Sequence, residues 1–319
     1  MALKHIISSV ASLVPIVKRF RAKPAVKGGK TYSARYCYSV WLRHLIMAKR
    51  NGLNTCPKVV VELGPGSSIG IGLAALICGC DKYFALDFIK FANMESNIKI
   101  FDELVTLFKN KSPIPGDNEF PRVKPYLEEY NFPCDILNET RLRHMLEKSR
   151  IQRIRDSISD SQSKDSLIQY EAPWYGENIL KRESVDMIYS QAVLEHVKDL
   201  KRTYRVMHSW LKATGYMSHQ IDFKCHGTAD EWNGHWTYSD FKWKLITGKR
   251  PYSINRMPHS THIKTLVEEG FEVTCDKTIK SDSHYAINDL APKFRFLSGH
   301  DLITSGAFIQ AVKKTKSNE

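Results

Sequence analysis

The chain has 319 residues, 42% of them hydrophobic, and a formal net charge of +13 from 47 basic and 34 acidic side chains. This length suits one large α/β domain with additions, and no apolar run reaches the roughly 18 residues of a membrane-spanning helix. The seven cysteines are dispersed without the paired spacing of a metal or redox motif, which favours reduced thiols in a cytoplasmic protein. The positive charge is compatible with nucleic acid, acidic lipid or an anionic substrate as a partner, and it does not distinguish among these three.

The first 23 residues are apolar and then basic, ending in the cluster from Lys18 to Lys23. A secretory signal has the reverse order, with its charge before its apolar part. Two interpretations stay open for this segment: a helix lying on an anionic membrane surface, and a helix packed on the rest of the protein. We expect residues 1–54 to form a helical preface, because Tyr38 to Lys49 has the apolar spacing of a helix.

Residues 58–63 form a β-branched run that predicts a strand buried on both faces of a parallel sheet. The glycines that follow, Gly64 and Gly66, permit backbone conformations closed to other residues and a close approach to a ligand. Ser67 or Ser68 is suited to cap the next helix, whose N-terminus would face that ligand.

A second strand is predicted at residues 83–86, and Asp87 stands at its carboxyl end. An acid in this position accepts hydrogen bonds from both hydroxyls of a ribose. The glycine spacing is G-x-G-x-x-x-G with Glu62 two residues ahead, rather than the G-x-G-x-x-G of dinucleotide-binding proteins. The pattern therefore predicts a nucleoside site and disfavours a dinucleotide.

The rest of the chain also alternates between predicted helices and predicted strands. We expect helices at residues 101–110, 139–158, 239–247 and 260–269, a proline-rich loop at 112–125, and strands at 216–221, 271–275 and 307–312. The last two strands are expected to form an antiparallel edge hairpin that completes a seven-stranded sheet.

The glycine turn Glu62-Leu63-Gly64-Pro65-Gly66 resembles the first motif of class I S-adenosylmethionine-dependent methyltransferases. The resemblance extends through residues 170–173, 185–197 and 205–216, in the family's order, and covers about residues 55 to 225. The sequence departs from the family pattern at Ala213-Thr214, where the family has Pro-Gly. We expect Gly215 to end the preceding helix in spite of this change.

The resemblance implies a Rossmann-like α/β fold with a doubly wound seven-stranded sheet and an antiparallel edge strand. It implies a methyltransferase domain at residues 55–315 after the helical preface. Between Asp87 and Tyr170 the family needs only a helix and a strand, so we expect a helical insertion at about residues 101–166. Such an insertion over the carboxyl edge of the sheet would be a candidate lid.

The resemblance also implies S-adenosylmethionine as the cofactor. Glu62, Gly64 and Gly66 would hold its methionine end, Asp87 its ribose, and Glu171 its adenine amino group. Tyr170 or Trp174 would stack on the adenine ring. Gln191, which follows the fourth strand, is a further candidate cofactor contact. The simpler alternatives are a capped surface acid for Glu62, a turn residue for Asp87 and a loop residue for Glu171.

Three residues are candidates for removing a proton from the acceptor. His196 lies in a Leu-Glu-His element that resembles one in small-molecule methyltransferases, and Asp222 and His226 follow the fifth strand. Trp232, Asn233 and Trp236 could stack on and hydrogen-bond a sugar ring. The histidines at 219, 226 and 235 with Asp222 match no established metal-site spacing, so no metal is expected.

The favoured function is methylation of a hydroxyl on a small molecule or a saccharide. Two alternatives stay open: an RNA methyltransferase, suggested by the net charge, and a noncatalytic protein that retains the fold. Residues 190–193 lack the Asn-Pro-Pro-aromatic element of base amino-group methylation, and no RNA-binding module is evident.

Overall fold

The computed structural model describes residues 30–314 apart from residues 91, 161–162, 164, 175 and 249–252. The membrane contact suggested for residues 1–23 therefore lies outside the described residues. Within the described ranges, no helix is long and apolar enough to cross a membrane.

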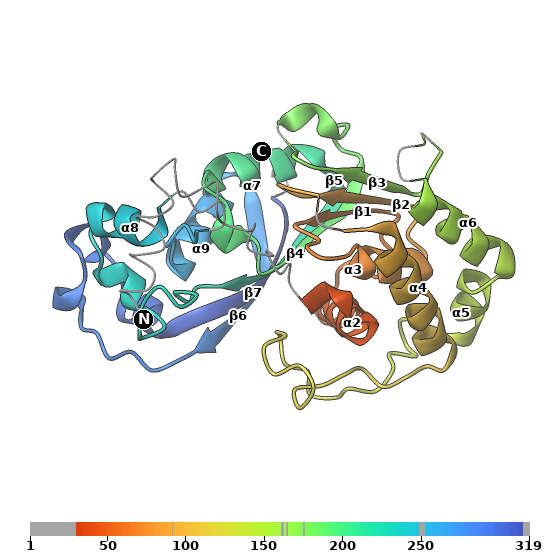
Figure 1. Cartoon of the computed structure of the whole chain (residues 1–319), viewed down its shortest axis with the longest axis horizontal. Coiled ribbons are helices and arrows are strands. Elements are labelled where there is room, and N and C mark those ends of the chain that lie inside the picture. The colour runs from red at the N-terminus through yellow and green to blue at the C-terminus, as the bar shows by residue number, and fades with distance from the viewer. Residues whose placement is uncertain are drawn as a thin grey trace, which may run out of the picture.

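One sheet of seven strands, in the order β3-β2-β1-β4-β5-β7-β6, organises the described part of the chain (Figure 1). The strands are β1 (Val59–Leu63), β2 (Lys82–Leu86), β3 (Ile168–Glu171), β4 (Val185–Gln191), β5 (Leu211–Asp222), β6 (Phe271–Lys280) and β7 (Thr304–Lys313). The strands β1 to β5 are parallel, and β7 runs antiparallel between β5 and β6. The predicted fold class, including the antiparallel strand, is confirmed.

Helices cover both faces of the sheet. They are α2 (Ala34–Arg50), α3 (Gly70–Ile77), α4 (Met94–Lys109), α5 (Glu139–Met145), α6 (Lys148–Ser159), α7 (Leu200–Trp210), α8 (Asp240–Thr247), α9 (His259–Glu268) and α10 (Gly299–Ile303). Side chains of α2, α3 and α4 share one apolar cluster with Val60 and Tyr83, whereas α7 and α9 share another with Val61 and Ile188. Neighbouring residues of one strand thus serve opposite cores, which explains why β1 is apolar throughout.

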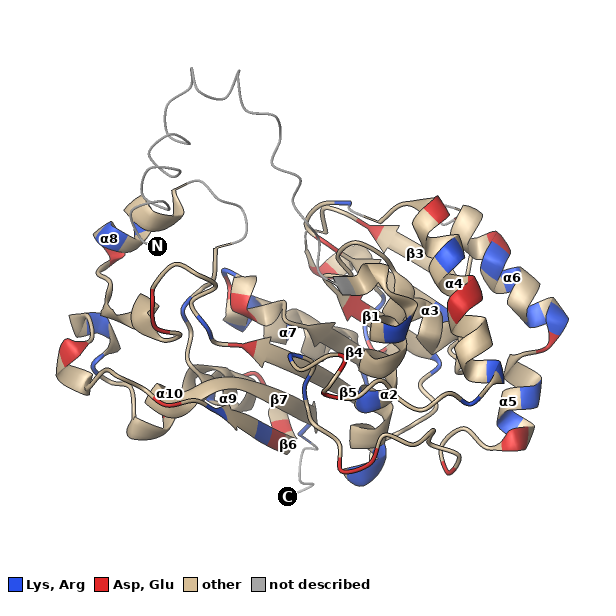
Figure 2. Ribbon diagram, turned by 60° about the horizontal axis from the view of Figure 1, so that its bottom comes forward, with Lys and Arg blue, Asp and Glu red and all other residues tan. Residues whose placement is uncertain are grey.

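The predicted charged helix at residues 139–158 is two helices, α5 and α6, joined at Leu146 and Glu147. The helix predicted at residues 101–110 is α4, which begins earlier, at Met94, where Asn93 accepts a hydrogen bond from the Ser96 N–H as its N-terminal cap. Lysine and arginine residues stand on the outer turns of α5 and α6 (Figure 2).

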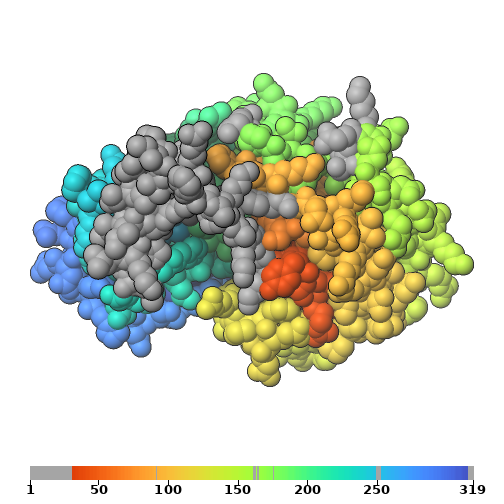
Figure 3. All heavy atoms as spheres, in the orientation of Figure 1, coloured from red at the N-terminus to blue at the C-terminus, as the bar shows by residue number. Residues whose placement is uncertain are grey.

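Helix α2 confirms the helix predicted at Tyr38 to Lys49 and extends it at both ends. Its Trp41, Leu42 and Leu45 side chains are no more than 1% exposed. The loop between α4 and α5 lies beside α2 at the molecular surface (Figure 3). The preface helix is therefore part of the main core.

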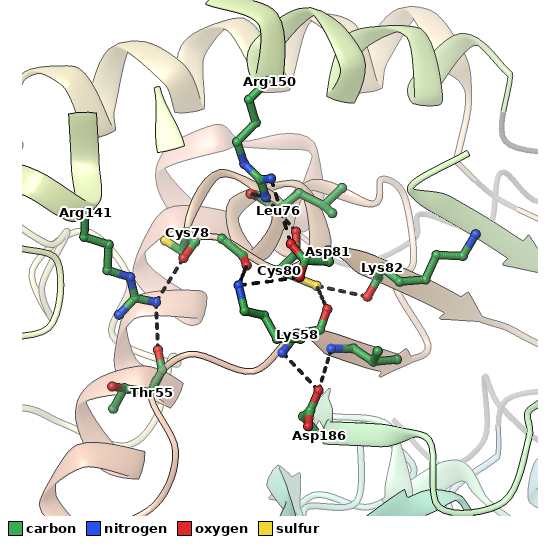
Figure 4. A network of polar contacts seen from close by, with 12 residues as sticks. Thr55, Lys58, Leu76, Cys78, Cys80, Asp81, Lys82, Arg141, Arg150 and Asp186 are labelled. Carbon is green, nitrogen blue, oxygen red and sulfur yellow. Dashed lines mark hydrogen bonds and ion pairs between the residues drawn. The ribbon is translucent and has the colours of Figure 1, made fainter. Parts of the chain in front are cut away.

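Two arginines attach α5 and α6 to the amino edge of the sheet (Figure 4). The Arg141 Nη2 donates to the carbonyls of Thr55 and Cys78, both at 3.0 Å. The Arg150 Nη2 donates to the carbonyls of Leu76, at 2.9 Å, and Cys80, at 2.7 Å. These carbonyls lie where β1 and β2 begin, at the opposite edge from the glycine turn. The expectation of a lid over the carboxyl edge is wrong for these two helices.

Candidate functional site

The glycine turn connects β1 to α3 at the carboxyl edge of the sheet. Gly64 and Gly66 have φ angles of 65° and 73°, in the left-handed region that favours glycine. A Cβ atom on Gly64 would lie 2.6 Å from the Val193 Cγ2, which leaves no room for another residue. The sequence thus predicted this turn correctly from its residue types.

Asp87 meets the glycine turn from the end of β2. Its Oδ2 accepts a hydrogen bond from the Gly66 N–H at 3.2 Å, and its Oδ1 accepts one from the Phe88 N–H at 2.7 Å. Burial raises the pKa of the Asp87 carboxyl, and the same two N–H groups oppose that shift. Each oxygen retains a lone pair for a ribose hydroxyl, so the residues fit the nucleoside part of the expected cofactor.

Glu62 lies beneath the turn, only 1% exposed, and its Oε2 accepts a hydrogen bond from the Tyr83 hydroxyl. Burial raises the pKa of Glu62 to about 7, although the Tyr83 hydroxyl lowers it in part. The Tyr83 ring leaves no space for a side chain at Gly72 of α3, where a Cβ would lie 2.0 Å from its Cζ. Glu62 thus ties β1 to β2 under α3, and its contact with the methionine end stays a prediction.

The adenine candidates lie at and after the end of β3. The Glu171 side chain is exposed, and its carbonyl accepts the Asp87 N–H at 3.0 Å. The Lys90 Nζ lies over the Tyr170 ring, 5.6 Å from the ring centroid. The Trp174 ring packs 5.9 Å from that of Trp210 in α7, so it belongs to the core on that face of the sheet. The adenine contact of Glu171 stays a prediction.

Gln191 ends β4 next to the candidate base residues on β5. Its Nε2 donates to the Gln220 Oε1 at 3.1 Å, which fixes the amide across the two strands. The position is partly exposed at the carboxyl edge. A contact with the cofactor is compatible with this position and stays a prediction.

The structure brings together His196, Asp222 and His226, the three candidate base residues. His226 Nε2 lies 3.4 Å from Asp222 Oδ2, and both side chains are about one-third exposed, at 34% and 33%. The rings of His196, in the short helix η4 (Leu194–His196), and His226 have centroids 5.2 Å apart. His226 has a φ angle of 49°, an unfavourable conformation for a histidine that the loop maintains. The three side chains thus form one cluster at the ends of β4 and β5.

The charges in this cluster are set by burial and by the histidine contact. Burial opposes ionisation of Asp222, yet the His226 imidazole and the Lys224 N–H bring its pKa below the ordinary value. Glu195 is 2% exposed, and neither of its carboxyl oxygens has a hydrogen-bond partner in the described part of the chain. Burial, and then the Asp222 charge, raise the pKa of Glu195 well above its usual range. The two neighbouring carboxyls therefore have pKa values shifted in opposite directions, that of Asp222 downward and that of Glu195 upward.

Sequence reasoning missed the Glu195 carboxyl as part of this site, and it named His235 only as a neighbour of the candidate bases. His235 is 1% exposed, and burial followed by the Arg256 charge lowers its pKa to about 3. The sequence offered one indication for Glu195, its position next to the candidate base His196. It did not show that Glu195 is buried, because burial depends on residues that are distant in sequence.

Two of the three residues proposed to bind a sugar ring, Asn233 and Trp236, hold the loop in place instead. Trp236 and Asn233 are fully buried. The Trp236 Nε1 donates to the Arg256 carbonyl at 2.9 Å, and the Asn233 Nδ2 donates to the Ser283 Oγ at 2.7 Å. The expectation that Trp236 stacks on a sugar is therefore wrong, because its ring belongs to a core under the loop.

Metal ligation finds no support in the described ranges. His219 points into the core on the α7 face, where its Nδ1 lies 2.8 Å from the Ser190 Oγ. Among the described residues, no group of three or more His, Cys, Asp or Glu side chains is arranged to hold a metal ion.

Comparison with known proteins adds a family match for part of the chain. The family model of the methyltransferase domain matches residues 156–218, which include β3, β4 and α7 but not the glycine turn. No curated protein matches the sequence. The segment matched by the family model contains His196 and Gln191.

Solved methyltransferase structures are similar to the chain at low sequence identity. An S-adenosylmethionine-dependent methyltransferase from Mesorhizobium loti is 15% identical, with 84% of this chain and 96% of that chain covered and a TM-score of 0.41. A chain from the complex between the Haloferax volcanii Trm112 methyltransferase activator and a putative methyltransferase is 14% identical over 90% of this chain and 96% of that chain, with a TM-score of 0.41. Phosphoethanolamine N-methyltransferase 2 from Haemonchus contortus, in complex with S-adenosyl-L-methionine, is 13% identical over 90% and 59%, with a TM-score of 0.42.

Residues 156–218 therefore match a methyltransferase domain. The glycine turn and Asp87, which lie outside that segment, fit the S-adenosylmethionine that the resemblance of the sequence implies.

Proposed function

We propose that this protein transfers the methyl group of S-adenosylmethionine to a hydroxyl group of a small molecule. The observation that carries the proposal is the Asp222–His226 pair, which lies beside His196 at the carboxyl edge of the sheet. A saccharide acceptor loses its main support because Trp236 is buried. The seven cysteines form no disulfide in the structure, which is consistent with the cytoplasmic location that we propose.

The bound cofactor supplies a methyl group activated by a positively charged sulfur, so the protein has to orient the acceptor and accept its proton. His226 is suited to that task because its side chain is partly exposed while Asp222 lies against its Nε2. The free Nδ1 of the ring then accepts the hydroxyl proton, and the ionised Asp222 stabilises the resulting imidazolium. Gly64, Gly66 and Asp87 would hold the cofactor, with Glu171 at its adenine side and Gln191 as a further contact at the end of β4.

Replacing His226 with Gln tests the base. We expect His226→Gln to lower kcat by about 100-fold or more while the affinity for S-adenosylmethionine is retained, because general bases contribute about 10²- to 10⁴-fold. Release of S-adenosylhomocysteine, measured over a panel of hydroxylated small molecules, gives the rate. His284→Gln is the matched control, since that histidine is 70% exposed in its side chain and pairs only with Glu231.

A turnover rate in His226→Gln equal to that of the His284 control would remove His226 from the mechanism. Turnover with RNA and with none of the hydroxylated small molecules would overturn the acceptor class in favour of the RNA alternative. Cofactor binding without turnover on either type of acceptor would favour the noncatalytic alternative.

Replacing Asp87 with Ala tests the cofactor site. Asp87→Ala removes two acceptor oxygens for the ribose, and two lost hydrogen bonds correspond to roughly 10- to 100-fold weaker binding. Calorimetric titration with S-adenosylmethionine measures this change. Asp81→Ala is the control, because Asp81 lies at the opposite end of β2 and is 58% exposed in its side chain. Equal affinities in the two variants would show that Asp87 does not bind the ribose.

A further inference from the structure

Helix α2 carries a fully buried histidine over the middle of the sheet. The His44 side chain is 0% exposed, and its Nδ1 lies 2.7 Å from the Ser218 Oγ of β5. The centroid of its ring is 5.4 Å from that of Tyr189 on β4 and 5.3 Å from that of Phe308 on β7. The imidazole therefore packs against three neighbouring strands.

One nitrogen of this imidazole has no hydrogen-bond partner. The Nδ1 of His44 is satisfied by the Ser218 hydroxyl, whereas its Nε2 makes no hydrogen bond within the part of the chain that the structure describes. An apolar ring would fill the same space without the cost of a buried unpaired polar atom. The unpaired Nε2 therefore indicates a role for His44 beyond packing.

The strand residues that lie toward the carboxyl edge from His44 include Gln191. Consecutive pairs on this face of the sheet are Tyr189 with Ser218 and then Gln191 with Gln220, because alternate residues of a strand share a face. His44 contacts both members of the first pair. The second pair comes next, at the edge where the candidate site lies.

His44 and Gln191 each have an unpaired buried atom. The Gln191 Oε1 has no hydrogen-bond partner among the described residues, while its Nε2 donates to the Gln220 Oε1 at 3.1 Å. Burial lowers the pKa of His44 to about 3, and a hydrogen-bonding interaction with the Gln191 amide opposes that shift. The imidazole of α2 and the amide at the end of β4 thus lie close to each other.

We propose that His44 is a positioning residue that acts on the bound cofactor through Gln191. With its Nδ1 anchored on Ser218, the imidazole fixes the rotation of the Gln191 amide and therefore the amide atom that is directed at the ligand. An amide held in advance adds affinity, because binding does not have to order it. The inference rests on the contact proposed between Gln191 and S-adenosylmethionine.

Two substitutions separate the two nitrogens of His44. The amide of an asparagine reaches the position of Nδ1, and the amide of a glutamine reaches that of Nε2. We expect His44→Asn to weaken the binding of S-adenosylmethionine about tenfold, because it retains a group for Ser218 and loses the one for Gln191. His44→Gln should bind within about threefold of the parent protein. Calorimetric titration measures both affinities.

A double-mutant cycle tests whether His44 acts through Gln191. Gln191→Ala should weaken cofactor binding about tenfold or more, since the contact itself is lost. Adding His44→Asn to Gln191→Ala should have no further effect, because the amide that His44 positions is absent.

His262→Asn is the matched control. The His262 side chain of α9 is also 0% exposed, its Nδ1 lies 2.8 Å from the Tyr204 hydroxyl, and its Nε2 has no partner in the described chain. It lies on the opposite face of the sheet, among the side chains of α7 and α9. This variant should bind S-adenosylmethionine like the parent protein.

The parent protein allows a measurement that needs no destabilising substitution. With ¹⁵N-labelled histidine, the Nε2 resonance of His44 should shift on saturation with S-adenosylmethionine, whereas that of His262 should not. This comparison decides the question if the melting temperature of His44→Asn shows that the variant is unfolded.

An affinity of His44→Asn equal to that of the parent would overturn the proposal, as would equal losses in His44→Asn and His44→Gln. A full second loss in the double variant, or a His44 resonance that the cofactor leaves unchanged, would do the same. If Gln191→Ala binds like the parent, the contact on which the inference rests is absent. All of these measurements use the cofactor without an acceptor, so their outcome is independent of methyl transfer.

Discussion

At the scale of single residues, the least ordinary group in the sheet is the Glu62 carboxyl. It lies in a central strand at 1% exposure, with the Tyr83 hydroxyl as a donor and a pKa raised to about 7 by burial. Burial destabilises the charged form of a carboxyl, and the hydroxyls of Tyr83 and Tyr189 offset only part of that effect here. Its protonation is therefore coupled to the stability of the whole fold.

The free energy of unfolding should fall as the pH rises from about 4.5 to about 7, the interval between the unfolded and folded pKa values of Glu62. In that window the unfolded chain releases the proton that the folded protein retains, a loss of about 1.4 kcal/mol per pH unit and on the order of 3 kcal/mol in total. Below the window the stabilising contribution is complete, and above it the contribution is lost. Glu62→Gln should remove most of this dependence.

Urea unfolding of the parent and of Glu62→Gln at several pH values measures the difference. Glu103→Gln, on an exposed position of α4, is the control. A parent and a Glu62 variant with the same pH dependence would show that Glu62 is ionised in the folded protein.

At the scale of elements, α2 holds the loop that precedes α5 through one buried arginine. Arg43 is fully buried, and its Nη1 donates to the carbonyls of Val123, at 3.1 Å, and Pro125, at 2.6 Å. Its Nη2 donates to the Pro115 carbonyl at 3.3 Å and lies 3.4 Å from Asp117. An irregular loop thus obtains partners for its carbonyl groups from a helix distant in sequence.

Arg43→Ala should destabilise the protein by about 3 kcal/mol or more, because it leaves buried carbonyls unpaired and opens a cavity. Arg50→Ala, on the same helix, should change stability by less than about 1 kcal/mol, since its partner Glu128 is 83% exposed in its side chain. Urea denaturation of both variants measures the contrast. Similar losses in the two variants would mean that the loop does not depend on Arg43.

The division between α5 and α6 could not be predicted from local sequence. Residues 139–159 contain neither Gly nor Pro, so their pattern is that of one helix. Arg141 and Arg150 nevertheless donate hydrogen bonds to separate groups of carbonyls. Met145 packs so closely against Gly79 that a Cβ atom on Gly79 would lie 2.3 Å from the Met145 Cε. These contacts are made with residues more than fifty positions away, and they decide where the helix ends.

At the scale of the whole molecule, the amino ends and the carboxyl ends of the parallel strands differ in what surrounds them. The amino edge is closed by α5 and α6, whose arginines bind the carbonyls ahead of β1 and β2. The carboxyl edge presents the glycine turn, Asp87 and the cluster around His226. Parallel strands place all their carboxyl ends on one side, so residues scattered from Glu62 to His226 meet there.

Residue types alone predicted the parallel strands, the glycine turn and the acid at Asp87. These features depend on local backbone conformation and on the spacing of strand ends, which residue types specify directly. The meeting of His196, Asp222 and His226 could also be anticipated, because each follows a parallel strand.

Which polar residues are buried became evident from the three-dimensional structure alone. In the described chain, Trp236 and Asn233 lie in the core, the carboxyl oxygens of Glu195 have no hydrogen-bond partner, and Glu62 points toward Tyr83. The structure also placed α5 and α6 at the amino edge rather than over the site. The physical reason is the same in each case: burial and pairing depend on side chains that are distant in sequence, and no local pattern records them.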